Sequence, residues 1–467
     1  MNLPGVNRHF VIFVGFFQYP EVIKQPGSLR KLGDHYQPWW TRKSVKEIEK
    51  IYNFLPAYFY ASFNKVCFPE IDFPMENHIV DGPDDKEFNR IDLENYVNSL
   101  PNRDCLLHLT LDKDCLPIDF RVQFKGNELS CLVDYVDIFL YPRGEGMFSL
   151  KARVDKNDKG ADTLEDVSAL QCALRELYTH VRVNQAKPIP VGSWLDSMLF
   201  GYWPELEFPH LVSDHYYCNK LKSFCALELG ENALLPENLG HILYELGTVS
   251  PIGSSSTPGP MKPAESYFQE ILDHNRISVF DNWSGLSLFD TFTLLFHQPQ
   301  RSYSLMHNAE SFYLPIYIHS LYLKLILFKT NAEIANEHVL SRKNLKLRDW
   351  FIEVRNDFDL SQISYNFLPN LINNRMRFSL GICEELQFLE SKVETINNYI
   401  SEKQEQSTNR VLTILSVLAL GSAFWDSSEW IQKLFGIPEQ DYQILSGSLV
   451  TTVLLVVIII ILLGRRK

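Results

Sequence analysis

The sequence predicts an α+β cytosolic domain, then a long stalk helix, and then two transmembrane helices at its carboxy-terminal end. Three observations indicate this fold class: apolar runs of strand length before residue 300, a heptad repeat that starts at Ile382, and a twenty-residue apolar segment near the end of the sequence. We expect a cytosolic α+β domain over residues 1–300, a helical region and stalk over 301–408, and a transmembrane hairpin over 409–467.

The composition narrows the possible function classes. The net charge of −13 over 467 residues argues against a surface that binds nucleic acid directly. Residues 1–17 include charged positions and no cleavage pattern of a signal peptide, so we expect the bulk of the protein in the cytosol. The eight cysteines are scattered, and no CxxC pair, phosphate-binding loop or hydrolase motif occurs. We expect no enzyme activity, no metal site and no resident cofactor.

The amino-terminal part shows both strand and helix patterns. The apolar run 10–17 has the length of a strand, and segments 133–141 and 146–153 flank a Pro-Arg-Gly-Glu turn signal, which predicts a hairpin. Residues 163–181 carry apolar side chains at helical spacing and predict an amphipathic helix. Segment 250–260 is rich in serine, proline and glycine and contains no charge, which predicts a flexible loop.

Segment 311–328 is apolar enough to be mistaken for a membrane span. It contains Pro315, His319 and Lys324, and a charge in the middle of a bilayer is costly. We therefore expect a buried helix here rather than a span.

A heptad repeat marks the start of the predicted stalk. Apolar residues recur at alternating spacings of four and three, at Ile382, Leu386, Leu389, Val393, Ile396 and Ile400. This pattern is typical of a coiled coil and predicts a stalk that self-associates. No proline or glycine interrupts the chain from Ile382 to Leu420, so the same helix is expected to continue into the uncharged run 411–425. The alternative is that 411–425 is a core helix and the seam belongs to an intramolecular hairpin.

The two predicted spans cover about residues 409–428 and 444–463. The second contains no charged residue and matches the thickness of the hydrocarbon core of a bilayer. Arg410 lies at the edge of the first span and Arg-Arg-Lys follows the second, which places both termini in the cytoplasm by the positive-inside rule. We expect a multi-pass protein of the cell inner membrane.

This arrangement over residues 300–467 resembles the CorA-type family of two-span ion channels. The resemblance implies a funnel-shaped homopentamer in which five first spans line a pore and five second spans face lipid. The family's Gly-Met-Asn signature is missing, because Gly436, Ile437 and Pro438 stand at the candidate position. Without the asparagine amide, magnesium selectivity of the usual kind is not expected.

Divergent members of this superfamily that lack the signature accompany type III CRISPR systems. The resemblance therefore implies an antiviral effector opened by a nucleotide-like second messenger, such as S-adenosylmethionine joined to AMP (SAM-AMP), that causes ion leakage through the membrane. Two alternatives stay open: a divalent metal cation transporter of the magnesium type, and a membrane-anchored interaction protein without a pore.

Helix phase predicts which side chains of the first span line the pore. Continued from the seam at about 3.6 residues per turn, the inward face carries Ile414, Leu418, Ser422, Asp426 and Glu429. Rings of Ile414 and Leu418 would form an apolar gate, and rings of Asp426 and Glu429 would favour cations. The alternative is that the two acids simply lie in water at the outer end of the helix.

One arginine is a candidate ligand contact. Arg143 lies in the turn of the predicted hairpin, where its guanidinium could bind an anionic ligand. The expected partners are further copies of the chain, membrane lipid, ions and a small-molecule second messenger.

Overall fold

The structure of the chain is a computed structural model that describes most of the first 436 residues. The described residues are 5–18, 40–42, 59–67, 106–141, 144–155, 163–199, 220–230, 236–297, 302–335, 342–436, and the single residues 447 and 452. The chain divides into two compact units. One unit comprises Met1–Glu337 with Lys346–Phe388, and the other comprises His338–Leu345 with Leu389–Lys467.

Twelve strands of the described residues form one sheet in the first unit. They are β1 (Val6–Gln18), β2 (Trp40–Arg42), β3 (Leu107–Leu111), β4 (Phe120–Phe124), β5 (Asn127–Leu140), β6 (Glu145–Val154), β7 (His180–Val183), β8 (Ile189–Pro190), β9 (Lys222–Leu229), β10 (Arg276–Ile277), β11 (Trp283–Leu288) and β12 (Thr291–Phe296). The order is β10-β11-β12-β9-β1-β6-β5-β4-β7-β8, with β3 paired to β5 and β2 paired to β3. Neighbours run antiparallel except for the parallel pair β9 and β12.

The predicted first strand and hairpin are confirmed. β1 lies between β6 and β9, and β5 and β6 pair antiparallel with Ile138 opposite Phe148. The register of the hairpin shifts between Val133 and Tyr135, so Asp134 lies in a β-bulge. Bulges of this kind redirect side chains at the rim of a sheet.

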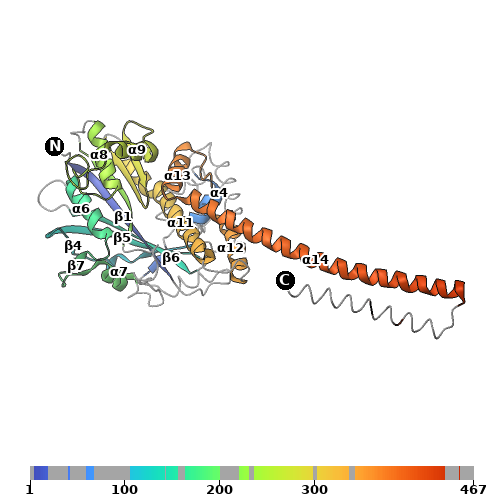
Figure 1. Ribbon diagram of the computed structural model, residues 1–467. Helices are drawn as coiled ribbons and strands as arrows, with labels where there is room; N and C mark the ends of the chain where they lie inside the picture. The colour runs from blue at the N-terminus through green and yellow to red at the C-terminus, as the bar shows by residue number, and fades with distance from the viewer. Residues whose placement is uncertain are drawn as a thin grey trace, which may run out of the picture. The chain divides into compact units, whose positions relative to one another are not determined.

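Helices cover both faces of the sheet. The helices of the described residues are α4 (Ala61–Cys67), α6 (Leu164–Arg175), α7 (Val191–Leu199), α8 (Pro236–Gly247), α9 (Glu265–Asn275), α10 (Ser302–Asn308), α11 (Leu314–Ala335), α12 (Arg342–Phe358), α13 (Phe367–Ser379) and α14 (Ile382–Phe435), with the 3₁₀-helix η1 (Lys113–Cys115) and the π-helix η3 (Ala309–Tyr313). Figure 1 shows α6, α8 and α9 on one side of the sheet and α11 and α13 on the other.

The first face of the sheet packs against α6, α7, α8 and α9 in one apolar core. Val11 and Phe13 of β1 belong to this core together with Leu170, Leu243 and Phe268 of the helices. The predicted helix 163–181 is the shorter α6, which Thr163 caps by accepting a hydrogen bond from the Asp166 amide.

The opposite face packs against α11 through aromatic rings. The ring of Phe224 stacks on Phe10 at 6.3 Å between centroids and contacts Phe292 at 5.4 Å and Tyr317 of α11 at 5.7 Å. Because alternate residues of β1 and β9 point to opposite faces, the same strands supply both cores.

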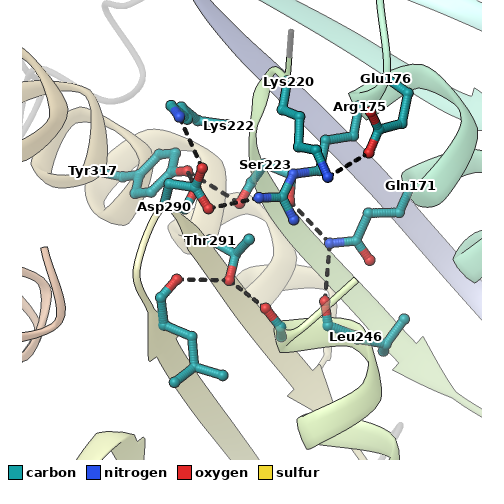
Figure 2. A network of polar contacts seen from close by, with 12 residues as sticks. Gln171, Arg175, Glu176, Lys220, Lys222, Ser223, Leu246, Asp290, Thr291 and Tyr317 are labelled. Carbon is teal, nitrogen blue, oxygen red and sulfur yellow. Dashed lines mark hydrogen bonds and ion pairs between the residues drawn. The ribbon is translucent and has the colours of Figure 1, made fainter. Parts of the chain in front are cut away.

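A network of polar contacts fixes α11 to the sheet (Figure 2). The Asp290 carboxylate accepts hydrogen bonds from Lys222 and Arg175, each at 2.8 Å. Burial raises the pKa of this carboxyl, but the charges of Lys222 and Arg175 outweigh burial and bring the pKa below its ordinary value. The Tyr317 hydroxyl donates to the carbonyls of Ser223, at 3.2 Å, and Asp290.

The loop over 250–260 differs from the prediction. It is not a flexible linker, because the buried Glu245 carboxylate accepts hydrogen bonds from the Gly253 and Ser255 amides, at 2.9 and 2.7 Å, and from the Ser255 hydroxyl at 2.6 Å. A carboxylate with several amide donors orders a loop strongly, and the sequence pattern of the loop itself contains no sign of this partner.

One helix among the described residues is long and apolar enough to cross a membrane by length and composition alone. It runs over Leu305–Ile334, and 78% of its most apolar window is buried inside the protein. Lys324 donates to Glu385 at 2.9 Å, and Lys329 pairs with Glu145 at 2.6 Å. This confirms the prediction of a buried helix over 311–328.

The heptad seam lies on α14, within the described residues. The predicted single helix is confirmed, since α14 runs without a break over Ile382–Phe435. However, the first five seam side chains are at most 8% exposed within the single chain. These five are Ile382, Leu386, Leu389, Val393 and Ile396. These side chains are buried within one chain, and self-association of the stalk stays a prediction.

Candidate functional site

The distal part of α14 is the first candidate site. Five large apolar side chains between Val411 and Leu420 are 53–60% exposed. They are Val411, Leu412, Leu415, Leu418 and Leu420. Residues 411, 415 and 418 lie on one side of a helix, whereas 412 and 420 lie roughly 100° and 180° away from Val411. Apolar side chains around most of a helix indicate contact with lipid or with another chain.

The predicted pore residues divide by exposure along this segment. Ile414 is half-buried within the chain, Leu418 is 55% exposed, and Ser422 is exposed. Asp426 and Glu429 lie in the helical part of α14, but their side chains are outside the described residues. The helix places all five at the spacing that we predicted, and their role as pore lining stays a prediction.

The signature position lies where α14 ends. Gly436 follows the helix directly and adopts a φ of +62°, in the left-handed region that terminates many helices. Ile437 and Pro438 lie outside the described residues, as does the predicted span 444–463 apart from residues 447 and 452. The candidate ligand contact Arg143 also lies outside them.

A second candidate site is a pocket of about 350 Å³ in the first unit. It is lined by the start of β1, by the bulge of β5, by the end of β6, and by α10 with the π-helix η3. Its polar lining combines basic side chains, from Arg8, Lys151 and Arg153, with two acidic ones, from Asp134 and Glu310. Sequence reasoning missed this pocket.

Two ion pairs cross the pocket. The Lys151 ammonium lies 2.7 Å from the Glu310 carboxylate, and Arg153 donates from Nε to Asp134 at 2.9 Å. Lys151 also lies over the ring of Phe10, 4.7 Å from its centroid. The pocket therefore contains basic side chains, acidic side chains that form ion pairs with them, and the ring of Phe10, which we call its aromatic floor.

A sequence signal for this pocket does exist in β6. Lys151 and Arg153 alternate with Ala152 and Val154, which are buried, at the end of a strand that also contains apolar residues such as Met147, Phe148 and Leu150. Two charges on the same face of a central strand need partners there, so the alternation marks a polar site.

The described side chains of the two sites are mainly charged groups in ion pairs and exposed apolar groups. Within the described ranges, no group of three or more histidine, cysteine, aspartate or glutamate side chains is placed to hold a metal ion. Burial raises the pKa of the Cys225 thiol to about 12, which keeps it protonated at neutral pH. The arrangement of charges in the pocket can bind an ion or a charged ligand.

Comparison with known proteins adds little to this geometry. No protein-family model matches the sequence, and no curated protein matches it. Among solved structures, the chain is similar to one described as the structure of the full-length CmaX protein, with 12% sequence identity. The match covers 55% of this chain and 93% of that chain with a TM-score of 0.19, which carries no argument about fold or function.

Proposed function

We propose that the protein is a CorA-like ion channel of the cell inner membrane, in which several copies, five by analogy with that family, surround a cation pore. In this proposal a nucleotide-like second messenger of the SAM-AMP type binds the cytosolic domain and opens the pore. The resulting ion leakage would serve type III CRISPR antiviral defence.

The observation that carries this proposal is the change along α14. Its first turns have buried apolar side chains, and the same unbroken helix then exposes Leu412, Leu415 and Leu420. A water-exposed helix with such side chains around most of its surface is unfavourable, whereas a lipid-exposed one is not. One rigid element thus joins a folded domain to a membrane-like segment, which is what a gated channel needs.

The test measures ion flux in proteoliposomes that contain the full-length protein. Cation flux that appears only after SAM-AMP is added supports the proposal, and steady magnesium flux without any messenger contradicts it in favour of a transporter. Replacing Asp426 and Glu429 by their amides should then reduce cation conductance sharply, because two rings of negative charge are lost. Unchanged conductance and selectivity would leave the acids as solvated residues at the helix end.

A second candidate is a membrane-anchored interaction protein without a pore. The buried seam favours it, because the strongest self-association signal of the sequence is already satisfied inside one chain. Under this alternative, asparagine at Ile414 and Leu418 leaves the permeability of proteoliposomes unchanged. A channel with an apolar gate would instead leak without messenger, because asparagine rings hold water in the constriction.

A further inference from the structure

We propose that the pocket between β6 and α10 binds an anionic, phosphate-bearing ligand that replaces the Glu310 carboxylate as the partner of Lys151. The claim that the pocket binds a phosphate-bearing anion depends only on the geometry of the pocket. The claim that this anion is the gating messenger rests on the proposed function.

The charges around Lys151 support an exchange of partners. Lys151 and Glu310 form a pair in which the two side chains are 15% and 29% exposed, so the pair lies near the pocket mouth and a solute can reach it. A phosphate is a stronger multiple acceptor than a carboxylate, and it can also bind an arginine. Arg8 and Arg153 line the same pocket and would supply that second contact.

The aromatic floor favours a ligand with a flat ring. Phe10 is 5% exposed and stacks on Phe224 behind it, so its position is fixed by packing. The ring also lies under Lys151 and lines the pocket, so a flat ring of a ligand can reach it only when Lys151 turns toward that ligand's phosphate. A nucleotide combines both features, because its base can stack on an aromatic ring while its phosphate binds a cation.

Glu310 belongs to an element that can respond to the exchange. It lies in the π-helix η3, which joins α10 to α11 without a loop. π-Helical turns are rare and are frequently found at functional sites. When a ligand takes Lys151, Glu310 loses that ion pair and keeps its hydrogen bond with Tyr135 of β5, so one of its two polar ties to the sheet is released.

The response has a route from the pocket to the stalk within the first unit. Lys324 lies fourteen residues after Glu310, which is about 21 Å along a helix. Lys324 donates to the Glu385 carboxylate at 2.9 Å, and Asn331 also donates to it. Glu385 lies in the first turn of α14, so a movement of α11 reaches the start of that helix.

The decisive experiment measures binding of SAM-AMP to the full-length protein in detergent micelles by calorimetry. Lys151→Met should weaken binding about tenfold or more, because a charge-assisted contact is lost. Glu310→Gln should strengthen binding several-fold, because the competing carboxylate is gone. The matched control is Arg121→Gln on β4, which removes an exposed ion pair with Asp119 and should leave the affinity for SAM-AMP unchanged.

If the ligand competes with Glu310 for Lys151, the two pocket variants should change the affinity for SAM-AMP in opposite directions. Equal weakening by both variants, or wild-type binding by Lys151→Met, overturns the site, and so does a wild-type protein that does not bind the probe. If these variants keep wild-type messenger-dependent flux, the channel proposal survives and the site fails. If they shift binding as expected but no protein conducts ions, the site survives and the channel proposal fails.

A further variant tests the route to α14. Lys324→Met should keep wild-type affinity for SAM-AMP and lose the messenger-dependent flux, and Lys324→Arg should restore the flux. Loss of binding in Lys324→Met, or wild-type flux in it, contradicts the route through Glu385.

Discussion

Two apolar helices of this protein meet opposite surroundings. The helix over Leu305–Ile334 passes the length and composition test for a membrane span, and yet it is the core helix of the first unit. The distal part of α14 leaves Leu412 and Leu420 more than half exposed within the single chain. Apolar composition alone therefore does not decide whether a helix is buried in the protein.

The difference lies in the polar side chains of each helix. Lys324, Lys329 and Tyr317 of α11 each have a protein partner, in Glu385, Glu145 and the carbonyls at Ser223 and Asp290. Buried polar groups on a helix need such partners, so they mark a helix that packs against protein. The run 411–425 contains no charged residue that would need one.

The largest effect is expected from charges in the exposed segment of α14. Changing Leu412, Leu415 and Leu420 together to lysine should prevent the segment from crossing the membrane, because each lysine costs about 2.5–3.5 kcal/mol at the bilayer centre. A Lys433→Cys reporter should react with an impermeant maleimide outside intact cells, and the triple change should abolish this reaction. Lysine at Gln404, Gln406 and Asn409, which are exposed on α14 before the segment, is the control and should preserve labelling.

The second-largest effect is expected from removal of the Asp290 carboxylate in the network of Figure 2. Asp290→Ala leaves Lys222 and Arg175 without their carboxylate and should lower the free energy of unfolding by about 3–5 kcal/mol. Glu176→Ala removes the partner of Lys220 in an exposed pair and should cost at most about 1 kcal/mol. Chemical denaturation measures both, and equal losses would show that the Asp290 carboxylate contributes no more than an exposed ion pair.

Because His319 of α11 is buried, we expect it to make the stability of the protein depend on pH. Burial, followed by the nearby charge of Arg377, lowers the pKa of His319 to about 4. The unfolded chain takes up the proton near pH 6.5 and the folded one only near pH 4, so stability is lost as the pH falls through this window. The loss is about 3 kcal/mol at its limit.

A substitution isolates this contribution from other acid effects. The ring of His319 lies 5.5 Å from Phe63 and 6.4 Å from Phe358, centroid to centroid, so His319→Phe keeps an aromatic packing. The variant should lose less stability than the wild type between pH 6.5 and 4. Identical pH profiles would mean that His319 is protonated in the folded protein and that α11 is hydrated there.

The smallest effect is expected in the loop that Glu245 orders. Glu245→Gln replaces one acceptor oxygen by a donor and removes the charge, and it should lower stability by about 1–2 kcal/mol. Hydrogen exchange at the Gly253 and Ser255 amides should become faster, whereas the exposed Glu270→Gln on α9 should change neither. Slow exchange in Glu245→Gln would mean that the loop is ordered by other contacts.

Much of the fold could be predicted from periodicity. The turn signal between 133–141 and 146–153 identified the hairpin, and the absence of breakers after Ile382 identified α14, because both patterns are local. Partners distant in sequence could not be predicted. The partner of the loop 250–260 is a single glutamate on α8. The residues that bury the heptad seam likewise cannot be predicted from the seam sequence.

The candidate sites show the same limit. The pore positions followed from helix phase, which the unbroken α14 supports at the level of the backbone. The pocket depends on Arg8, Asp134, Lys151 and Glu310, which lie up to about three hundred residues apart and meet only because β1, β5, β6 and η3 come together. Only the alternation of Lys151 and Arg153 in β6 was visible locally.

The π-helix Ala309–Tyr313 also sets how this part of the fold can relax. It contains one residue more than the α-helical repeat accommodates, and with both ends of the helix anchored that residue cannot be expelled. The extra residue can only move along the helix, as a π-bulge that migrates. Each step of this migration rotates one residue by about 100° around the helix axis. Glu310 lies within this defect, so its side chain changes direction when the defect moves toward α11, and the first turns of α11 shift with it.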